Sequence, residues 1–395
     1  MSFLVTSTKL CDLYLTERDV IERFIGSGLF TWGLGPSGSL GDNSSISKSS
    51  PVQTISTGLN WTRVCSSGTT GTVDQAGGIK LDGTLWLWGC NVAGALGNND
   101  TITRSSPVQT VATGTNWCNL SLSSGSTFNG LSAGLKTDGT LWLWGVNNNG
   151  QLGNSSTINR SSPVQTVSTG TNWARVSSGH SHAVGLKNDG TLWTWGLNTQ
   201  GQLGNNNATS QSSPVQTIST AVNWCTVAAH GCMSAGLKTD GTLWLWGINL
   251  GLLGNNNTIA RSSPVQTVST GTDWRQISIN GVFNTQAIKV NGTLWSWGCN
   301  VSGGLGNNDT ISRSSPVQTI STGTNWRTLA SLNGGNVGGA IKTDGTLWLW
   351  GCNVSGGLGT NTTTNQSSPV QTVILGQNWK CASIGCTSSA VTNNF

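Results

Sequence analysis

Three histidines are the only side chains in this chain whose ordinary pKa allows both metal binding and proton transfer near neutral pH. They are His180, His182 and His230, and the first two form a His-Ser-His triplet. Such a triplet can supply two ligands to a transition metal, but a protein site needs more than two. No carboxylate or cysteine lies close to the triplet in sequence. We therefore predict no metal site.

The remaining polar residues do not form a catalytic constellation. The two glutamates, Glu17 and Glu22, both precede the repeated part of the chain, and most aspartates stand in turns. Aspartate is common in turns because its side chain accepts hydrogen bonds from nearby backbone amides. The chain also lacks the phosphate-binding Gly-x-x-x-x-Gly-Lys loop. We therefore predict no enzyme activity, no catalytic residues and no cofactor.

The dominant feature of the chain is a repeat. The hexapeptide Ser-Ser-Pro-Val-Gln-Thr occurs seven times, at intervals of 50 to 56 residues. Self-similarity at such a period is typical of propellers and solenoids, in which one supersecondary unit is copied. The prolines of the seven copies are Pro51, Pro107, Pro163, Pro214, Pro264, Pro316 and Pro369.

Each copy predicts four short strands. In one copy they cover 174–178, 183–187, 191–195 and 215–219, with alternating side chains in the third and an Asn-Asp-Gly turn before it. An Asp-Gly pair between two alternating runs is the strongest local signal for a β-hairpin. Tryptophans recur before the first strand and within the third. Because each indole can bury a large area, we expect them to form a core between the sheets.

The two ends of the chain predict that the copies close into a ring. The stretch from Trp379 to Phe395 has only the first two strands of a copy, whereas 28–33 and 51–54 supply the third and fourth. Closure protects sheet edges that an open array would expose. We therefore predict an all-β fold: a seven-bladed β-propeller of four-stranded antiparallel blades, with the last blade closed by strands from both termini.

One motif resembles the repeat of the regulator of chromosome condensation family. It is Gly-x-Leu-x-x-Trp-Gly-x-Asn-x-x-Gly-x-Leu-Gly at 190–204, together with Val-Ser-Ser-Gly-His-Ser-His from Val176. The resemblance covers residues 27–395 and implies a seven-bladed propeller. Members of that family include guanine-nucleotide exchange factors for the GTPase Ran, a β-lactamase inhibitor and a plant UV-B photoreceptor, so the fold does not select a function. The exchange factors' wedge insertion and acidic face, and the photoreceptor's Gly-Trp-Arg-His-Thr motif, have no match here.

The copies differ mainly in the loop between the first and second strands. The spacing is 19 residues from Trp61 to Lys80 but 14 from Trp173 to Lys187. Loops that break a repeat on one face are candidate binding sites, although drift of a loop tip explains the same variation. The binding residues predicted in these loops are Thr69, Asp74, Gln75, Phe128, Asn129, Phe283 and Asn284.

Residues 1–26 lie outside the repeat and form a predicted docking segment, separate from the propeller at 27–395. Thr16-Glu-Arg-Asp resembles a helix-capping box, which predicts a short helix over 17–24. Such a helix either packs on the ring or docks to a partner, and we favour the partner. The apolar residues expected to make the contact are Leu13, Val20, Ile21 and Phe24.

Composition limits the classes of partner. Charged residues make up only 8% of the chain, against about 25% in an average soluble domain. The net charge of +5 is mild, and the lysine before most turns has a carboxylate nearby, so nucleic acid is not an expected partner. A surface of Asn, Ser, Thr and Gly instead resembles virion and surface proteins.

The expected location follows from the cysteines and from the lack of apolar segments. Cysteines at equivalent positions of different copies, such as Cys90 and Cys299, should lie too far apart for a disulfide. Neither a secretory signal nor a membrane span is recognisable. We therefore predict synthesis in the cytoplasm without a signal peptide, followed by display on a virion.

The predicted function is non-enzymatic binding. We expect a structural or host-recognition component of a phage-type virion, with protein partners in a larger assembly and a cell-surface receptor or glycan as its target. The alternative is a cytosolic regulatory scaffold resembling a guanine-nucleotide exchange factor for a small GTPase.

Overall fold

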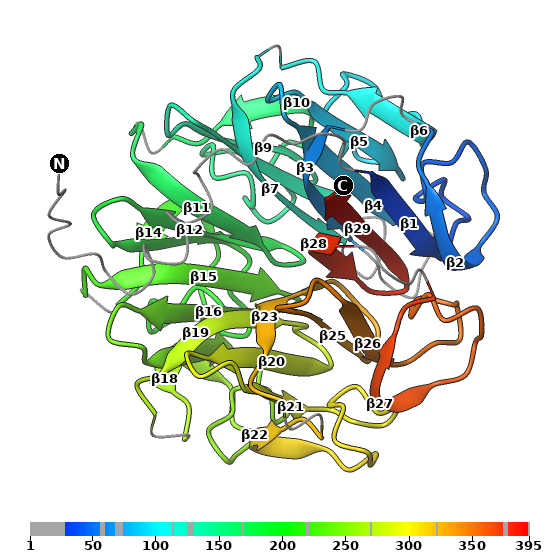
Figure 1. Ribbon diagram of the computed structural model, residues 1–395. Helices are drawn as coiled ribbons and strands as arrows, with labels where there is room; N and C mark the ends of the chain where they lie inside the picture. Colours follow the sequence, from blue (N-terminus) through cyan, green and yellow to red (C-terminus); the bar gives the residue numbers. More distant parts are fainter. Residues whose placement is uncertain are drawn as a thin grey trace, which may run out of the picture.

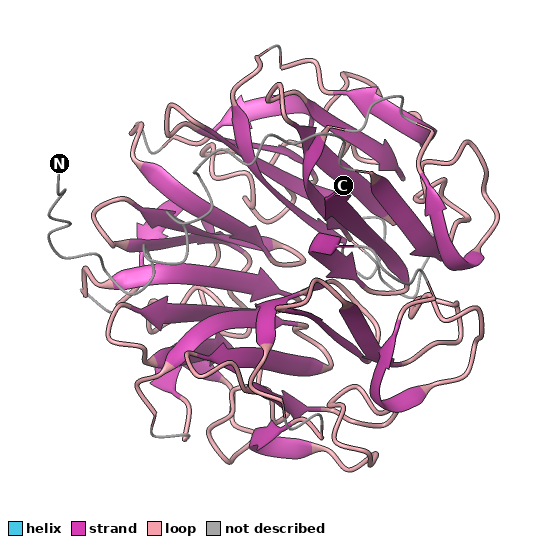
Figure 2. Cartoon of the chain, in the orientation of Figure 1, coloured by secondary structure: helices cyan, strands magenta, loops and turns pink. Residues whose placement is uncertain are grey.

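Seven β-sheets surround a central axis like the blades of a propeller (Figures 1 and 2). The computed structural model describes residues 28–55, 60–67, 74–112, 114–124, 130–167, 170–218, 221–268, 271–320, 323–373 and 378–393. All the regular elements in these ranges are strands, which confirms the predicted all-β class. Among these residues there is accordingly no helix that could cross a membrane.

Each blade has four antiparallel strands ordered from the axis to the rim, and we number the blades along the chain. Blades 1 to 3 contain β3 (Trp61–Ser66), β4 (Gln75–Lys80), β5 (Leu85–Gly89) and β6 (Arg104–Gln109); β7 (Trp117–Ser124), β8 (Gly130–Lys136), β9 (Leu141–Gly145) and β10 (Arg160–Gln165); and β11 (Trp173–Ser178), β12 (His182–Lys187), β13 (Leu192–Gly196) and β14 (Gln211–Gln216). Blades 4 to 6 contain β15 (Trp224–His230), β16 (Met233–Lys238), β17 (Leu243–Gly247) and β18 (Arg261–Gln266); β19 (Trp274–Ile279), β20 (Asn284–Lys289), β21 (Leu294–Gly298) and β22 (Arg313–Gln318); and β23 (Trp326–Leu329), β25 (Val337–Lys342), β26 (Leu347–Gly351) and β27 (Gln366–Gln371). Blade 7 combines β28 (Asn378–Ile384) and β29 (Thr387–Asn393) with β1 (Leu29–Gly33) and β2 (Lys48–Gln53).

The hairpin between the second and third strands forms at the Asp-Gly pairs, as predicted. In blade 1, Gly83 has φ +75°, a conformation that glycine adopts without the steric cost of a Cβ atom. Asp82 Oδ1 accepts hydrogen bonds from Thr84 N at 3.0 Å and from Thr84 Oγ1 at 2.6 Å. These turns lie together at one end of the ring, which we call the turn face. The loops between the first and second and between the third and fourth strands lie at the other end, the loop face.

Adjacent blades are joined by the same two contacts at all seven seams. The second tryptophan of a third strand donates its indole N–H to the preceding blade, as Trp88 Nε1 does to Ser39 O at 2.8 Å. A residue with positive φ in the loop between the third and fourth strands donates its backbone N–H to the next blade, as Asn99 does to Ser161 O at 2.8 Å. The acceptor is always the first serine of a Ser-Ser-Pro sequence, which gives the repeated hexapeptide a structural role.

The predicted tryptophan core lies between the blades. Trp61 and Trp88 are 1% and 0% exposed, and their rings meet edge to face with centroids 6.1 Å apart. Equivalent pairs recur in the other blades, inside apolar clusters that include the leucines of the third strands. In blades 1 to 6 the first tryptophan of the third strand, such as Trp86, is only half-buried, so part of the indole surface faces solvent.

Strands from both ends of the chain close the ring. In blade 7, β1 lies between β29 and β2, with Leu29 opposite Val391. The two general seam contacts are present here too: Trp32 Nε1 donates to Gly357 O at 2.8 Å, and Asn361 N donates to Ser49 O at 3.0 Å. One contact is additional: β24 (Ser331–Leu332), from blade 6, pairs in parallel with β28.

Candidate protein-binding groove

The three histidines lie near the axis, at the loop-face ends of blades 3 and 4. The rings of His180 and His230 meet edge to face with centroids 5.1 Å apart. Ser234 Oγ donates to Gln202 O at 2.8 Å, so it accepts from His182 Nε2 at 2.9 Å. Burial lowers the pKa of His182 and of His230 to about 3. Both side chains are therefore neutral. His182 hydrogen-bonds across the seam between blades 3 and 4, whereas His230 Nδ1 accepts from Gly281 N of blade 5 at 3.1 Å.

A serine with the spacing of a hydrolase motif is also structural. Gly130-Leu-Ser-Ala-Gly134 matches Gly-x-Ser-x-Gly, which in hydrolases forms a sharp turn between a strand and a helix. Here Ser132 is buried within β8 and its hydroxyl donates to Ala95 O at 2.7 Å. A nucleophile elbow is therefore not formed at this serine.

Three of the residues predicted to bind in the variable loops are buried at the seams. Asp74 and Gln75 are each 1% exposed, and Asn284 is 0% exposed. Asp74 Oδ2 accepts from Thr387 Oγ1 of blade 7 at 2.9 Å, and Asn284 Nδ2 donates to Val337 O of blade 6 at 2.9 Å. Gln75 and Asn284 begin second strands, so the loops are shorter than the sequence spacing predicts. These side chains hold blades together and do not face solvent.

Phe283 is the predicted loop residue that keeps some solvent exposure, since it is half-buried. The other three residues assigned to the loops, Thr69, Phe128 and Asn129, lie outside the described residues. The docking residues Leu13, Val20, Ile21 and Phe24 lie outside them as well.

On the turn face, each repeated lysine lies between two indole rings. Lys80 Nζ is 5.1 Å from the ring centroid of Trp61 and 4.5 Å from that of Trp86. The same arrangement occurs in blades 2 to 6. Cation–π attraction therefore holds these ammonium groups against the sheet. Burial lowers the pKa of Lys80, and the nearby Asp82 opposes that change.

A groove of about 360 Å³ lies on the turn face between blades 1 and 2. Thr62, Arg63 and Leu81 form one wall, and Asn116 and Trp117 form part of the other. Arg63 is exposed and Leu81 is 54% exposed. Within the described ranges, Arg63 makes no ion pair. The groove therefore offers a guanidinium group and an apolar side chain to a ligand.

A second hollow of about 350 Å³ adjoins the outer end of the same seam. It is lined by Val111, Ala112, Lys136, Trp142 and Pro163. We refer to the two hollows together as the blade 1–2 groove. It combines Trp and Arg, the residue types that most often dominate the energy of protein interfaces.

The sequence contains a signal for this groove that repeat spacing alone does not reveal. Leu81 stands at a position that is Thr137, Thr239 or Thr343 in blades 2, 4 and 6. It is Asn188 in blade 3 and the apolar Val290 in blade 5, and Arg63 has an equivalent arginine, Arg175, in blade 3. Among blades 1 to 6, blade 1 is the one that combines an apolar residue after the repeated lysine with an arginine two residues after the first-strand tryptophan.

Asp82 lines the groove, and Asp138 is the corresponding turn residue of blade 2. Hydrogen bonds from Thr84 lower the pKa of Asp82, and those from Thr140 lower the pKa of Asp138. Both carboxylates are therefore fixed anions at neutral pH. Cys118 lines the groove, and burial raises the pKa of its thiol, so it is not an activated nucleophile.

Eight cysteines of the described ranges are free thiols. Burial raises the pKa of Cys65 to about 11 and that of Cys386 to about 12. Cys225 is disulfide-bonded. The expectation of free thiols is therefore confirmed for these eight cysteines and wrong for Cys225. In the same ranges, no three His, Cys, Asp or Glu side chains come together as metal ligands.

Comparison with known proteins identifies relatives along nearly the whole chain. Residues 28–392 match the family model of the RCC1-like domain. The mitochondrial RCC1 domain-containing protein RUG3 of Arabidopsis thaliana is 26% identical over 278 residues, which are 66% of this chain and 61% of that protein. The ultraviolet-B receptor UVR8 of the same plant is 28% identical over 294 residues, 72% and 64% of the two chains. The chain thus spans less than two thirds of the length of these relatives.

A shorter match and two solved structures complete the comparison. The regulator of chromosome condensation of Mus musculus is 36% identical over 138 residues, 33% of this chain and 32% of that protein. Yeast RCC1 (Prp20), in a crystal structure with Kap60, superposes with a TM-score of 0.80 at 17% identity, covering 100% of this chain and 95% of that one. Human WBSCR16 superposes with a TM-score of 0.78 at 18% identity, covering 93% and 99%. These two structures share the fold with this chain.

Proposed function

Because the chain belongs to the RCC1-like domain family, we propose that it is a non-enzymatic, protein-binding ring that serves as a regulatory scaffold. The names of its relatives, a receptor and a regulator among them, support a binding role. A fold of this kind hosts many functions. The proposal therefore depends on the blade 1–2 groove, where this copy of the repeat departs from the others.

The observation that carries the proposal is the exposed pair Arg63 and Leu81. An arginine and an aliphatic side chain beside half-buried indoles can be desolvated together by a partner, which is the usual composition of an energetic hot spot. The carboxylate of Asp82 would orient a bound partner, because it repels acidic groups and accepts hydrogen bonds from donors at the same edge of the groove. The expected ligand is a protein segment with an apolar side chain next to a hydrogen-bonding group.

The regulatory scaffold has more support than a virion component. The named relatives come from Arabidopsis thaliana, Homo sapiens and Mus musculus, and none of their names refers to a particle. Display on a virion, with attachment to a receptor or glycan, rests only on the charge-poor composition. Detection of the chain in purified phage particles by mass spectrometry would reverse this preference.

A photo-crosslinking experiment tests the groove. A photoreactive amino acid replaces Leu81 in one variant and Val290, the equivalent residue of blade 5, in a matched control. We expect crosslinks to a defined protein from position 81, lost when Arg63→Ala is added, and none from position 290. Equal crosslinking from both positions, or none from position 81, would contradict a partner in this groove.

Guanine-nucleotide exchange is a second candidate function. It is favoured by the 36% identity to the regulator of chromosome condensation and by a solved relative, Prp20p of Saccharomyces cerevisiae, which binds Gsp1p and histones. The test is release of a fluorescent guanine nucleotide from small GTPases of the source organism, with and without the purified ring. Acceleration that Arg63→Ala removes would assign the exchange partner to the groove.

Residues 1–26 are proposed to act separately, as the segment that docks the ring to its parent assembly through Leu13, Val20, Ile21 and Phe24. The loop residue Phe128 is proposed as a further contact to a partner. Deletion of 1–26 should leave a folded ring that is no longer incorporated into the assembly. The Phe128→Ala variant should be incorporated but should no longer attach to its partner or to the cell surface. Normal behaviour of both variants would remove both assignments.

A further inference from the structure

Isoleucines are exposed at equivalent points of five blades, in the loops between the third and fourth strands. Single exposed aliphatic side chains are common on protein surfaces. Here, however, the propeller repeat places five of them at one level around the loop face. This isoleucine rim consists of Ile46, Ile102, Ile158, Ile259 and Ile311, which are 60–64% exposed.

Each isoleucine of the rim stands two residues before a basic residue. The five basic partners are Lys48, Arg104, Arg160, Arg261 and Arg313. In blades 3 and 6 the same positions read Thr209-x-Gln211 and Thr364-x-Gln366. The apolar and the basic residue are therefore present together or absent together. This pairing separates five blades with a combined basic and apolar character from two that are neutral and polar.

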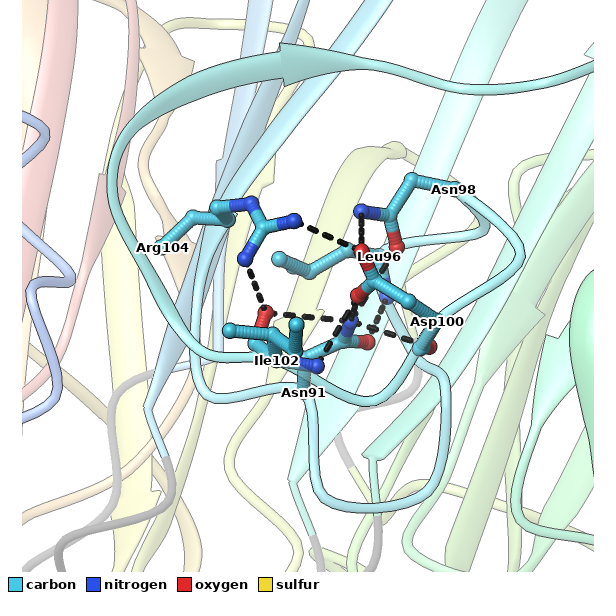
Figure 3. Close-up of polar contacts among 6 residues, drawn as sticks. All are labelled: Asn91, Leu96, Asn98, Asp100, Ile102 and Arg104. Carbon is cyan, nitrogen blue, oxygen red and sulfur yellow. Dashed lines mark hydrogen bonds and ion pairs between the residues drawn. The ribbon is translucent and has the colours of Figure 1, made fainter.

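The loop holds each isoleucine in a fixed position. In blade 1, Asp100 Oδ1 accepts from Ile102 N at 2.9 Å, and Asn91 Nδ2 donates to Asp100 Oδ1 at 2.9 Å (Figure 3). Asn91 Oδ1 also accepts from Leu96 N at 2.9 Å. The other four isoleucines receive the same support on their backbone N–H. Such preorganisation lowers the conformational entropy that binding would cost.

The basic residues give the rim a positive excess. Arg104 and Arg313 pair with an aspartate four residues earlier, at 2.6 and 2.8 Å. Blades 2 and 4 have Ser156 and Asn257 at the aspartate position. In the described part of the chain, the arginines of these two blades are not paired with a carboxylate. Each isoleucine belongs to a different blade, so the five are spaced around the ring.

We propose that the isoleucine rim is a membrane-contact surface, which sets the ring flat on an anionic lipid bilayer with its loop face toward the lipid. Equivalent residues of a ring lie in one plane perpendicular to its axis, and a bilayer is a plane that all five can enter together. Separate aliphatic anchors flanked by Arg or Lys suit the lipid interface, where the side chain is buried and the cation meets phosphate. A protein interface would instead favour a continuous apolar centre.

The membrane contact is independent of the proposed function, because the blade 1–2 groove is on the opposite face and stays accessible. Its test is co-sedimentation of the full chain with phosphatidylcholine vesicles that contain or lack phosphatidylserine. We expect binding to the anionic vesicles that falls with rising salt. Replacing all five isoleucines by threonine, the residue of blades 3 and 6, should abolish vesicle binding. Each replacement should weaken the affinity for the vesicles about fivefold, because apolar burial is lost.

Two further variants provide the controls. Thr209→Ile with Gln211→Arg adds a sixth site in blade 3 and should strengthen binding about fivefold or more. Val167→Thr with Val268→Thr removes apolar side chains that are 42% and 44% exposed on the turn face and lie outside the blade 1–2 groove, so this variant should change nothing. Unchanged melting temperatures would show that all variants fold. Absence of vesicle binding by the unmodified chain, or binding that survives the five threonines, would overturn the proposal.

Discussion

The seam between blades 3 and 4 and the seam between blades 6 and 7 differ at the axis but not at the rim. Both have the indole contact, with Trp246 Nε1 donating to Gln202 O at 2.9 Å and Trp32 Nε1 donating to Gly357 O at 2.8 Å. The first seam adds buried histidines, and the second adds the parallel pairing of β24 with β28. We call them the histidine seam and the closing seam. The indole contacts therefore join every pair of neighbouring blades in the same way, whereas the contacts near the axis differ from seam to seam.

Removing the closing seam should have the largest effect. Deletion of 380–395 removes β29 and most of β28, so that blade 7 retains only its two outer strands. We expect a sharp fall of the thermal midpoint, because the apolar faces of blades 1 and 6 lose the side chains that pack against them. Calorimetry measures the effect, and deletion of 1–26 is the control, since it leaves every described strand in place. A truncated ring that melts like the full chain would exclude closure by both termini.

The equality of the rim contacts can be tested with two tryptophans. Trp32→Ala in the closing seam and Trp246→Ala in the histidine seam each remove a side chain that is 0% exposed. We expect each to lower the free energy of unfolding by about 3–5 kcal/mol, as measured by urea titration. A large difference between the two variants would show that the rim contacts do not contribute equally at the two seams.

Acid should weaken the histidine seam and leave the closing seam unaffected. The pKa of His182 and of His230 is about 3 in the fold, below the ordinary value of about 6.5 in an unfolded chain. Between these values the unfolded chain binds more protons, so the folded state loses stability as pH falls from 6.5 toward 3. The slope is about 1.4 kcal/mol per pH unit for each histidine.

The matched variant for this prediction is His182→Thr, because Thr387 stands at the equivalent position in blade 7. Its unfolding free energy, measured by urea titration at several pH values, should depend less steeply on pH between 3 and 6.5. An unchanged slope would mean that His182 does not contribute to the acid sensitivity.

The smallest effect concerns the lysines between indole rings. Lys238 Nζ is 4.9 Å from the ring centroid of Trp224 and 4.5 Å from that of Trp244, whereas blade 7 has Thr392 opposite its first-strand tryptophan. Lys238→Thr should lower the free energy of unfolding by about 0.5–2 kcal/mol, the range of cation–π contacts. A Lys238→Met control keeps the aliphatic stem, so equal losses in both variants would assign the effect to the charge.

Local patterns were sufficient to predict the fold. Alternation in Leu-Trp-Leu-Trp and the Asp-Gly turns act within a few residues, and the hexapeptide repeats that information seven times. The complementary ends at 28–33 and 379–395 also predict closure correctly. The absence of helices from the described ranges agrees with the absence of a helical period from the repeats.

The candidate site was predicted less well, because a residue in a predicted loop can still be buried by residues of a neighbouring blade. Gln75 and Asn284 have polar side chains in copies with unusual spacing, which suggested binding. In the fold, Gln75 Nε2 donates to Ser123 O and Asn284 Nδ2 to Val337 O, both in the next blade. These acceptors lie about 50 residues away in sequence, so no local pattern indicates them.

The sequence by itself determined the blade, the number of blades and their closure, since these depend on period-two alternation, turn chemistry and repeat count. Only the tertiary structure decided which polar residues are buried at a seam, where β24 pairs, and which exposed side chains share a face. Those outcomes depend on contacts between blades, whose partners are separated by whole repeats. Arg63 beside Leu81, and the five isoleucines at one level of the ring, become surfaces only after the ring has closed.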